Sequence, residues 1–120
     1  MTMFLILKHK DLDAYKTSKA LVKEIYQLSR KLPFEERFNM VQQLRRAALS
    51  IKLNLAEGCS RKSNIERKRY FEIARGSAIE IDATLETAFE LDYFKNDDLN
   101  IIGELLNRCF AMLTKMITNI

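Results

Sequence analysis

The chain has 120 residues, of which 48% are hydrophobic and 30% are charged, and its formal net charge is +4. This length and composition fit one compact domain with a continuous core. Three glycines, one proline and no tryptophan exclude a turn-rich β-sandwich or β-barrel, so we expect an all-α protein.

The first ten residues, MTMFLILKHK, are predicted to form an extended N-terminal arm that packs on a neighbouring subunit. Their apolar run at positions 3–7 is too short for a signal-peptide core, and neither a preceding basic residue nor a cleavage site accompanies it. No other stretch approaches the roughly 20 apolar residues that a membrane span requires. We therefore expect a cytoplasmic protein with no membrane partner.

Apolar residues then recur every three or four positions, which is the spacing of amphipathic helices. Pro33 is expected to end the first helix, and Gly58 to end the second with a left-handed residue. Ser63 with Glu66 should cap the third helix, and Asn96 should begin the fourth. The predicted helices cover about 12–32, 36–57, 64–92 and 97–119.

Four such helices with short connections pack most simply as an up-down-up-down antiparallel four-helix bundle, which makes one domain of residues 1–120. The fourth helix is apolar over more than half of its circumference, from Leu99 to Ile120. Either it is the central helix of the bundle, or the protein associates with copies of itself. We favour self-association.

The cysteine and histidine content gives no sign of a metal site. Cys59 and Cys109 lack the second pair that a zinc site needs, and His9 lies far from both in the sequence. In the cytoplasm both thiols should stay reduced. Cys109 falls in an apolar helical stripe and should be buried, whereas Cys59 is expected to be exposed. We expect no metal and no cofactor.

Charge is distributed unevenly along the chain. Residues 45–75 contain nine Lys and Arg against three Asp and Glu, whereas residues 76–104 contain one against eight. These charges could form an ordinary solvated surface, or the cations could gather at one end of the bundle and attract the phosphates of RNA or DNA. No base-reading motif is present, so such contacts would be made to the backbone. The candidate contact residues are Arg45, Lys52, Arg61, Lys62, Arg67, Lys68 and Arg69.

A polar stripe on the second helix is predicted to face the third. This stripe consists of four residues spaced by four, four and three positions, so they share one side of the helix. They are Arg46, Ser50, Asn54 and Glu57. We expect Glu80 to pair with Arg46 in a hydrogen-bonded network that fixes the helix register. No nucleophile, metal set or phosphate loop accompanies these carboxylates, so we expect no catalytic residue and no enzyme. The predicted network comprises Arg46, Ser50, Asn54, Glu57, Ser77 and Glu80.

The segments QLRRAALSIKLNLAEGCSRKS and ARGSAIEI resemble the four-helix-bundle family encoded by intervening sequences within bacterial 23S ribosomal RNA genes. The resemblance runs from about Leu12 onward and leaves the first ten residues out. The positions that carry it are Gln43, Leu44, Arg45, Arg46, Ala47, Ala48, Ser50, Ile51, Asn54, Leu55, Ala56, Glu57, Gly58, Gly76, Ser77 and Glu80.

Members of that family, and the related accessory variability proteins of diversity-generating retroelements, form pentameric rings with a basic surface. The retroelement relatives bind nucleic acid and a partner reverse transcriptase. The resemblance therefore implies a homopentamer with a nucleic-acid-facing role.

The first hypothesis is a non-enzymatic, oligomeric RNA- or DNA-binding module. The alternative is a scaffold that binds a protein partner through the acidic end of the third helix and the apolar surface of the fourth.

Overall fold

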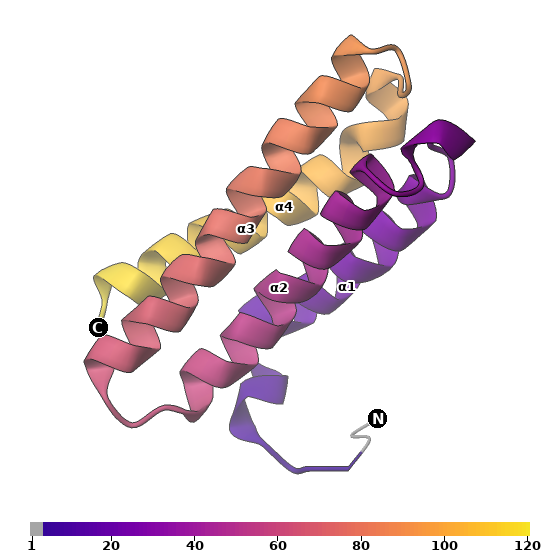
Figure 1. Cartoon of the computed structure of the whole chain (residues 1–120). Helices are drawn as coiled ribbons and strands as arrows, with labels where there is room; N and C mark the ends of the chain where they lie inside the picture. Colours follow the sequence, from indigo (N-terminus) through magenta and orange to yellow (C-terminus); the bar gives the residue numbers. More distant parts are fainter. Residues whose placement is uncertain (1–3) are drawn as a thin grey trace.

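The computed structural model describes residues 4–120, and in this range the chain is all-helical. Figure 1 shows the four α-helices side by side, with the α2–α3 connection at one end and the α1–α2 and α3–α4 connections at the other. No helix in this range is both long enough and apolar enough to span a membrane. The elements are η1 (Lys8–Asp11), α1 (Asp13–Ser29), η2 (Phe34–Glu36), α2 (Met40–Ser60), α3 (Asn64–Glu90) and α4 (Asn96–Thr118).

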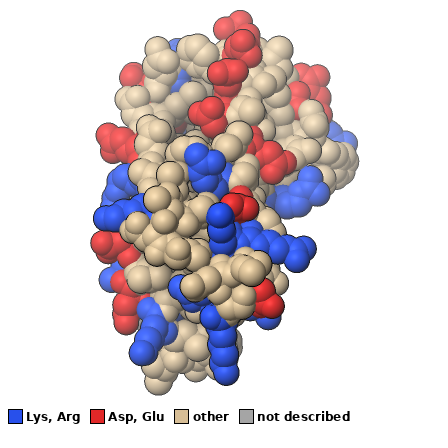
Figure 2. Space-filling model, turned by 90° about the vertical axis from the view of Figure 1, so that its left-hand side faces the viewer, with Lys and Arg blue, Asp and Glu red and all other residues tan. Residues whose placement is uncertain are grey.

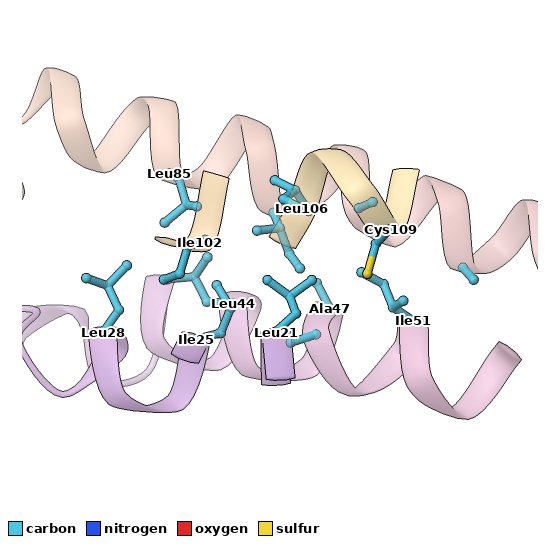
Figure 3. Packing of buried hydrophobic residues seen from close by; sticks show 14 of the residues in the cluster. Leu21, Ile25, Leu28, Leu44, Ala47, Ile51, Leu85, Ile102, Leu106 and Cys109 are labelled. Carbon is cyan, nitrogen blue, oxygen red and sulfur yellow. The ribbon is translucent and has the colours of Figure 1, made fainter. Parts of the chain in front are cut away.

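One apolar core runs along the bundle. Almost completely buried side chains from three helices point toward one another (Figure 3). They are Leu21 and Ile25 of α1, Leu44 and Ile51 of α2, and Cys109 of α4. Steps of three or four residues bring one stripe of each helix into this core. Helices α2 and α3 make the most extensive contact of any two helices, and both carry small buried side chains, which allow close packing. Their buried alanines are Ala47, Ala48, Ala74, Ala78 and Ala88.

The second helix begins later than expected. Pro33 does end the segment that contains α1, but the chain then forms the short 3-10 helix η2, and α2 starts at Met40. Phe34 and Phe38 are 75% and 71% exposed, so no buried apolar face holds this stretch as an α-helix. The Asn39 side-chain amide instead donates to Glu36 Oε1 at 3.0 Å.

The prediction for Gly58 is wrong. Helix α2 continues through Gly58 to Ser60, and none of the glycines in residues 4–120 has a positive φ. Gly58 is buried against α3, where an added Cβ would lie 2.6 Å from Phe71 Cε1. The glycine is therefore required by the close approach of the Phe71 ring, because any larger side chain would collide with it.

The two later helix starts use side-chain caps. Ser63 Oγ accepts a hydrogen bond from the Glu66 N–H at 3.3 Å, as expected for the N-cap of α3. Helix α4 starts at Asn96, but its N-cap is Lys95, whose backbone N–H donates to Asp98 Oδ2 at 2.9 Å. This bond is the largest factor that lowers the pKa of Asp98, and Lys31 Nζ, 3.6 Å from Asp98 Oδ1, lowers it further.

The wide apolar face of α4 is largely used within the bundle. Ile102, Leu106, Cys109 and Leu113 are buried, and burial raises the pKa of the Cys109 thiol to about 11. Further apolar residues flank this stripe and pack half-buried against the core, whereas Ile101 stays 60% exposed. The flanking residues are Leu99, Leu105, Phe110, Met112, Met116 and Ile117.

Cys59 is less exposed than expected. It lies in the last turn of α2 and packs half-buried against the apolar core. Burial is the main cause of a raised pKa for its thiol, so Cys59 does not have the low pKa of a reactive cysteine.

The N-terminal arm is described from Phe4 onward, so the part of the prediction that concerns residues 1–3 lies outside the described residues. Residues 4–7 leave the bundle and stay exposed, and η1 then leads into α1.

Candidate nucleic-acid interface

Five of the seven candidate contact residues, Arg61, Lys62, Arg67, Lys68 and Arg69, come together at the end of the bundle where α2 connects to α3 through residues 61–63. Figure 2 looks from the side on which this end lies in Figure 1, and Lys and Arg side chains are spread over the lower part of the molecule in this view while Asp and Glu predominate at the top. We call this end, comprising residues 58–70, the basic end. Its individual cations have different environments.

Arg67 holds the connection together. Its Nη1 donates to three main-chain carbonyls, those of Cys59 at 3.1 Å, Arg61 at 3.3 Å and Gly58 at 3.4 Å. Its guanidinium carbon lies 5.6 Å from the centre of the Phe71 ring. The carbonyls at the C-terminus of a helix have no intrahelical partners, and a cation there also interacts favourably with the negative end of the helix dipole. Arg67 is therefore a cap of α2, which makes it a poor candidate for a phosphate contact.

Arg61 is also engaged within the basic end. Its Nη2 lies 2.9 Å from Glu57 Oε2, with which it forms an ion pair, and 3.1 Å from the Tyr70 hydroxyl. The guanidinium carbon lies 5.0 Å from the Tyr70 ring centre. Tyr70 and Glu57 together raise the pKa of Arg61, so the side chain is charged at every physiological pH. Part of its positive charge is thus directed toward a carboxylate of its own chain.

Three cations remain for an external ligand. Lys62, Lys68 and Arg69 are exposed, and none of them makes a side-chain hydrogen bond or an ion pair with any residue in the range 4–120. Glu66 and Glu72 are exposed nearby on the same helix, so the local field is not purely positive. An unpaired Lys or Arg side chain on a surface keeps its donors available for the oxygens of a phosphate.

Arg45 and Lys52 do not belong to this end. Arg45 Nε donates to Ser29 Oγ of α1 at 2.8 Å, and its guanidinium carbon lies 4.7 Å from the Tyr26 ring centre. Lys52 Nζ lies 5.7 Å from the ring centre of Tyr15. At about 1.5 Å per helical residue, these two positions precede Arg61 by roughly 24 Å and 14 Å along α2. Both side chains tie α2 to α1, so the seven predicted contact residues do not form one surface.

Arg75 has a clear structural role that the sequence does not indicate. Its Nε donates to Thr114 Oγ1 at 2.8 Å, and its guanidinium carbon lies 4.1 Å from the Phe110 ring centre. The contact joins α3 to α4 across a separation of 39 residues. No local signal in the sequence points to such a pairing, and the same holds for the support that Tyr70 gives to Arg61.

The polar stripe of α2 forms a smaller network than expected. Ser77 Oγ donates to Ser50 Oγ at 2.8 Å, and Asn54 Nδ2 lies 2.9 Å from Ser50 O and 3.0 Å from Ser50 Oγ. Ser77 is buried, so this contact is a polar link within the α2–α3 interface. A function of this link in fixing the helix register stays a prediction.

The expected pair of Arg46 and Glu80 is wrong. Both side chains are exposed, and Arg46 Nη2 instead lies 3.4 Å from Gln43 Oε1 on its own helix. Ile81 takes the fully buried position on α3, and Glu80 lies about 100° away around the helix, toward solvent. Glu57 is also outside the network, because its carboxylate pairs with Arg61.

Comparisons with known proteins agree with the resemblance described above. A crystal structure of a protein of unknown function from the S23 ribosomal protein family of Bacteroides thetaiotaomicron superposes with a TM-score of 0.79. The two sequences are 23% identical, and the match covers 87% of this chain and 97% of that one, so the likeness concerns the fold alone. No curated protein matches the chain.

The family model described as "23S rRNA-intervening sequence protein" matches residues 10–115. This range includes all four α-helices up to the last turn of α4 and leaves out the exposed residues 4–7. The chain therefore belongs to the family of 23S rRNA-intervening sequence proteins.

Proposed function

We propose that this protein is a non-enzymatic module that binds the phosphate backbone of RNA or DNA at its basic end. The observation that carries the proposal is the set of three exposed cations, Lys62, Lys68 and Arg69, which have no partner within residues 4–120. The bonds of Arg61 and Arg67 hold the connection on which these three side chains are displayed. A preorganised set of cations loses less conformational entropy when it binds a polyanion.

Self-association is part of the proposal. We take the four helices as an up-down-up-down antiparallel bundle in a cytoplasmic protein. We take the assembly as the ring-like homopentamer that the family resemblance implies. One basic end supplies only three free cations, and the contribution of each phosphate contact is small at physiological salt. Repetition of the basic end in an assembly would raise the affinity through effective concentration, without any new kind of contact.

Binding can be tested with generic single-stranded and double-stranded oligonucleotides at about 50 mM and 200 mM salt. We expect the triple variant Lys62→Glu, Lys68→Glu, Arg69→Glu to lose binding at both salt concentrations while keeping its helical content. The matched control reverses three exposed lysines of α1, Lys16, Lys19 and Lys23, and changes the net charge equally. Equal losses in the two triple variants would show that only overall charge matters.

The second candidate function is a scaffold that binds a protein partner. It is favoured by Ile101 of α4, which is 60% exposed and lines one cleft together with Asp97 and Asp98. An apolar patch with an acidic rim is typical of a protein-binding surface. If the intact protein binds no oligonucleotide at about 50 mM salt, the first proposal fails and this second one remains.

A further inference from the structure

The arm before α1 carries four consecutive apolar side chains that the bundle leaves uncovered. Phe4, Leu5, Ile6 and Leu7 are 85%, 63%, 94% and 43% exposed. Single apolar residues are ordinary on a protein surface, but four in succession form a patch that favours contact with another apolar surface. The family match starts at residue 10, so this patch is a feature of the chain outside the family pattern.

Specific contacts fix the conformation of the arm and pack η1 on the bundle. Lys10 Nζ donates to the Leu5 carbonyl at 2.6 Å, and the Lys10 N–H donates to the Leu7 carbonyl at 3.2 Å. The His9 ring packs edge-on against Tyr15, with 4.7 Å between the ring centres. The η1 helix packs against α1 and α2, and in Figure 1 the arm runs away from the end of α4.

An apolar cleft of about 380 Å³ lies between the start of α1 and the last turns of α4. Leu12, Ala14, Met112 and Met116 line it together with three residues at its margin, Asp13, Lys115 and Asn119, and none of residues 4–7 does. The two methionines belong to the apolar flank of α4 that is only half-buried by the bundle. Methionine side chains adapt readily to the shape of an apolar partner.

We propose that this cleft binds residues 4–7 of a second copy of the chain. The arm supplies uncharged apolar side chains, and the cleft supplies an apolar surface close to where the arm leaves the bundle, so every copy carries both halves of the contact. Because the arm and the cleft are different surfaces, the contact serves a two-fold pair when it is reciprocal, or a ring when each arm reaches the next copy. The contact involves none of the free cations of the basic end, so it can be tested in the absence of nucleic acid.

The first test is a crosslink between chains. In a Cys59→Ser background, one chain carries Ile6→Cys and the other carries Met116→Cys, and the two are mixed and oxidised. We expect a disulfide-linked dimer that contains one chain of each kind. The matched control replaces Ile6→Cys by Phe34→Cys, which puts the thiol on a similarly exposed apolar position at the other end of the bundle. A yield no higher than that of the control would overturn the proposal.

The second test measures self-association by analytical ultracentrifugation over a range of concentrations. The double variant Phe4→Ser, Ile6→Ser should raise the dissociation constant at least about tenfold, because two buried apolar side chains are lost from the contact. The control double variant Phe34→Ser, Phe38→Ser removes a similar exposed apolar area and should leave the constant unchanged. Equal constants for the two variants, or a wild-type protein that is monomeric at every concentration, would contradict the proposal, whatever its affinity for nucleic acid.

Discussion

Arg67 and Arg69 show how much the contacts of a single residue decide. They are close neighbours in the basic stretch, and both were predicted to contact phosphates. The Arg67 side chain reaches back to the last carbonyls of α2, whereas the Arg69 side chain is exposed and makes no hydrogen bond or ion pair with residues 4–120. Position on the helix, rather than residue type, separates a cap from a candidate ligand-binding residue.

The substitution Arg67→Met should lower the free energy of unfolding by about 1–2 kcal/mol, because it removes charged hydrogen bonds to the end of α2 while keeping an apolar stem against Phe71. Arg69→Met is the matched change on the same helix turn and should stay within about 0.5 kcal/mol of wild type. Urea denaturation measures both. Equal stabilities of the two variants would remove the capping role of Arg67.

Gly58 and Gly76 make a second pair of matched positions. Gly58→Ala should destabilise the protein by about 1–3 kcal/mol, because the new methyl group would overlap the Phe71 ring. Gly76 lies in the middle of α3 with no atom within 4 Å of an added Cβ. Gly76→Ala should therefore stabilise the protein by about 0.5–1 kcal/mol through helix propensity. Opposite signs of the two changes in melting temperature are the expected result, and a stabilised Gly58→Ala variant would contradict the packing.

At the scale of elements, the α2–α3 interface combines small apolar residues with a polar link between two serines. The Ser50–Ser77 contact is within the interface, whereas Arg46 and Glu80 lie outside it. Ser77→Ala should cost about 1 kcal/mol, because the hydroxyl of Ser50 loses a partner. Arg46→Ala should remain within about 0.5 kcal/mol of wild type. A large loss for Arg46→Ala in thermal denaturation would restore the ion pair that the sequence suggested.

The start of α4 predicts a pH dependence. The pKa of Asp98 is lowered in the folded protein, chiefly by the Lys95 N–H. Its stabilising contribution is therefore complete above the unfolded pKa of about 3.9 and is lost as the pH falls through the lower folded value. The difference in urea midpoint between wild type and Asp98→Asn should shrink as the pH is lowered from about 6 to about 3. A difference that is constant over this range would rule out the cap.

The sequence predicted the helices well, because periodic apolar residues and the single proline are local properties. The prediction for Gly58 was wrong because glycine occurs both in left-handed turns and at sites of close packing. Here the close packing is against Phe71, which belongs to the next helix. The candidate site was predicted only as a region. A cation is free only if no partner in the folded chain lies close to it. Arg67 reaches main-chain carbonyls, Arg61 reaches Tyr70 and Arg45 reaches Ser29. Sequence spacing does not give these distances.

At the scale of the whole molecule, the uneven distribution of charge along the sequence gives the two ends of the bundle opposite charge. The α2–α3 connection, which carries the free cations, lies at one end of the bundle, and the end of α3 and the start of α4 lie at the other (Figure 1). In Figure 2, Asp and Glu predominate at the top. Such polarity orients a polyanion toward one end before contact is made. Under the proposed function, binding at that end depends on the three free side chains Lys62, Lys68 and Arg69.

The dependence of nucleic-acid affinity on salt tests the role of these three side chains most directly. The slope of log K against log salt counts the phosphates that the protein neutralises, at about 0.9 per contact for a duplex. Each of Lys62→Gln, Lys68→Gln and Arg69→Gln should reduce the slope by about one for every copy of the basic end that is in contact, whereas Arg45→Gln and Lys52→Gln should leave it unchanged. Slopes that do not differ between these two groups of variants would contradict binding at the basic end.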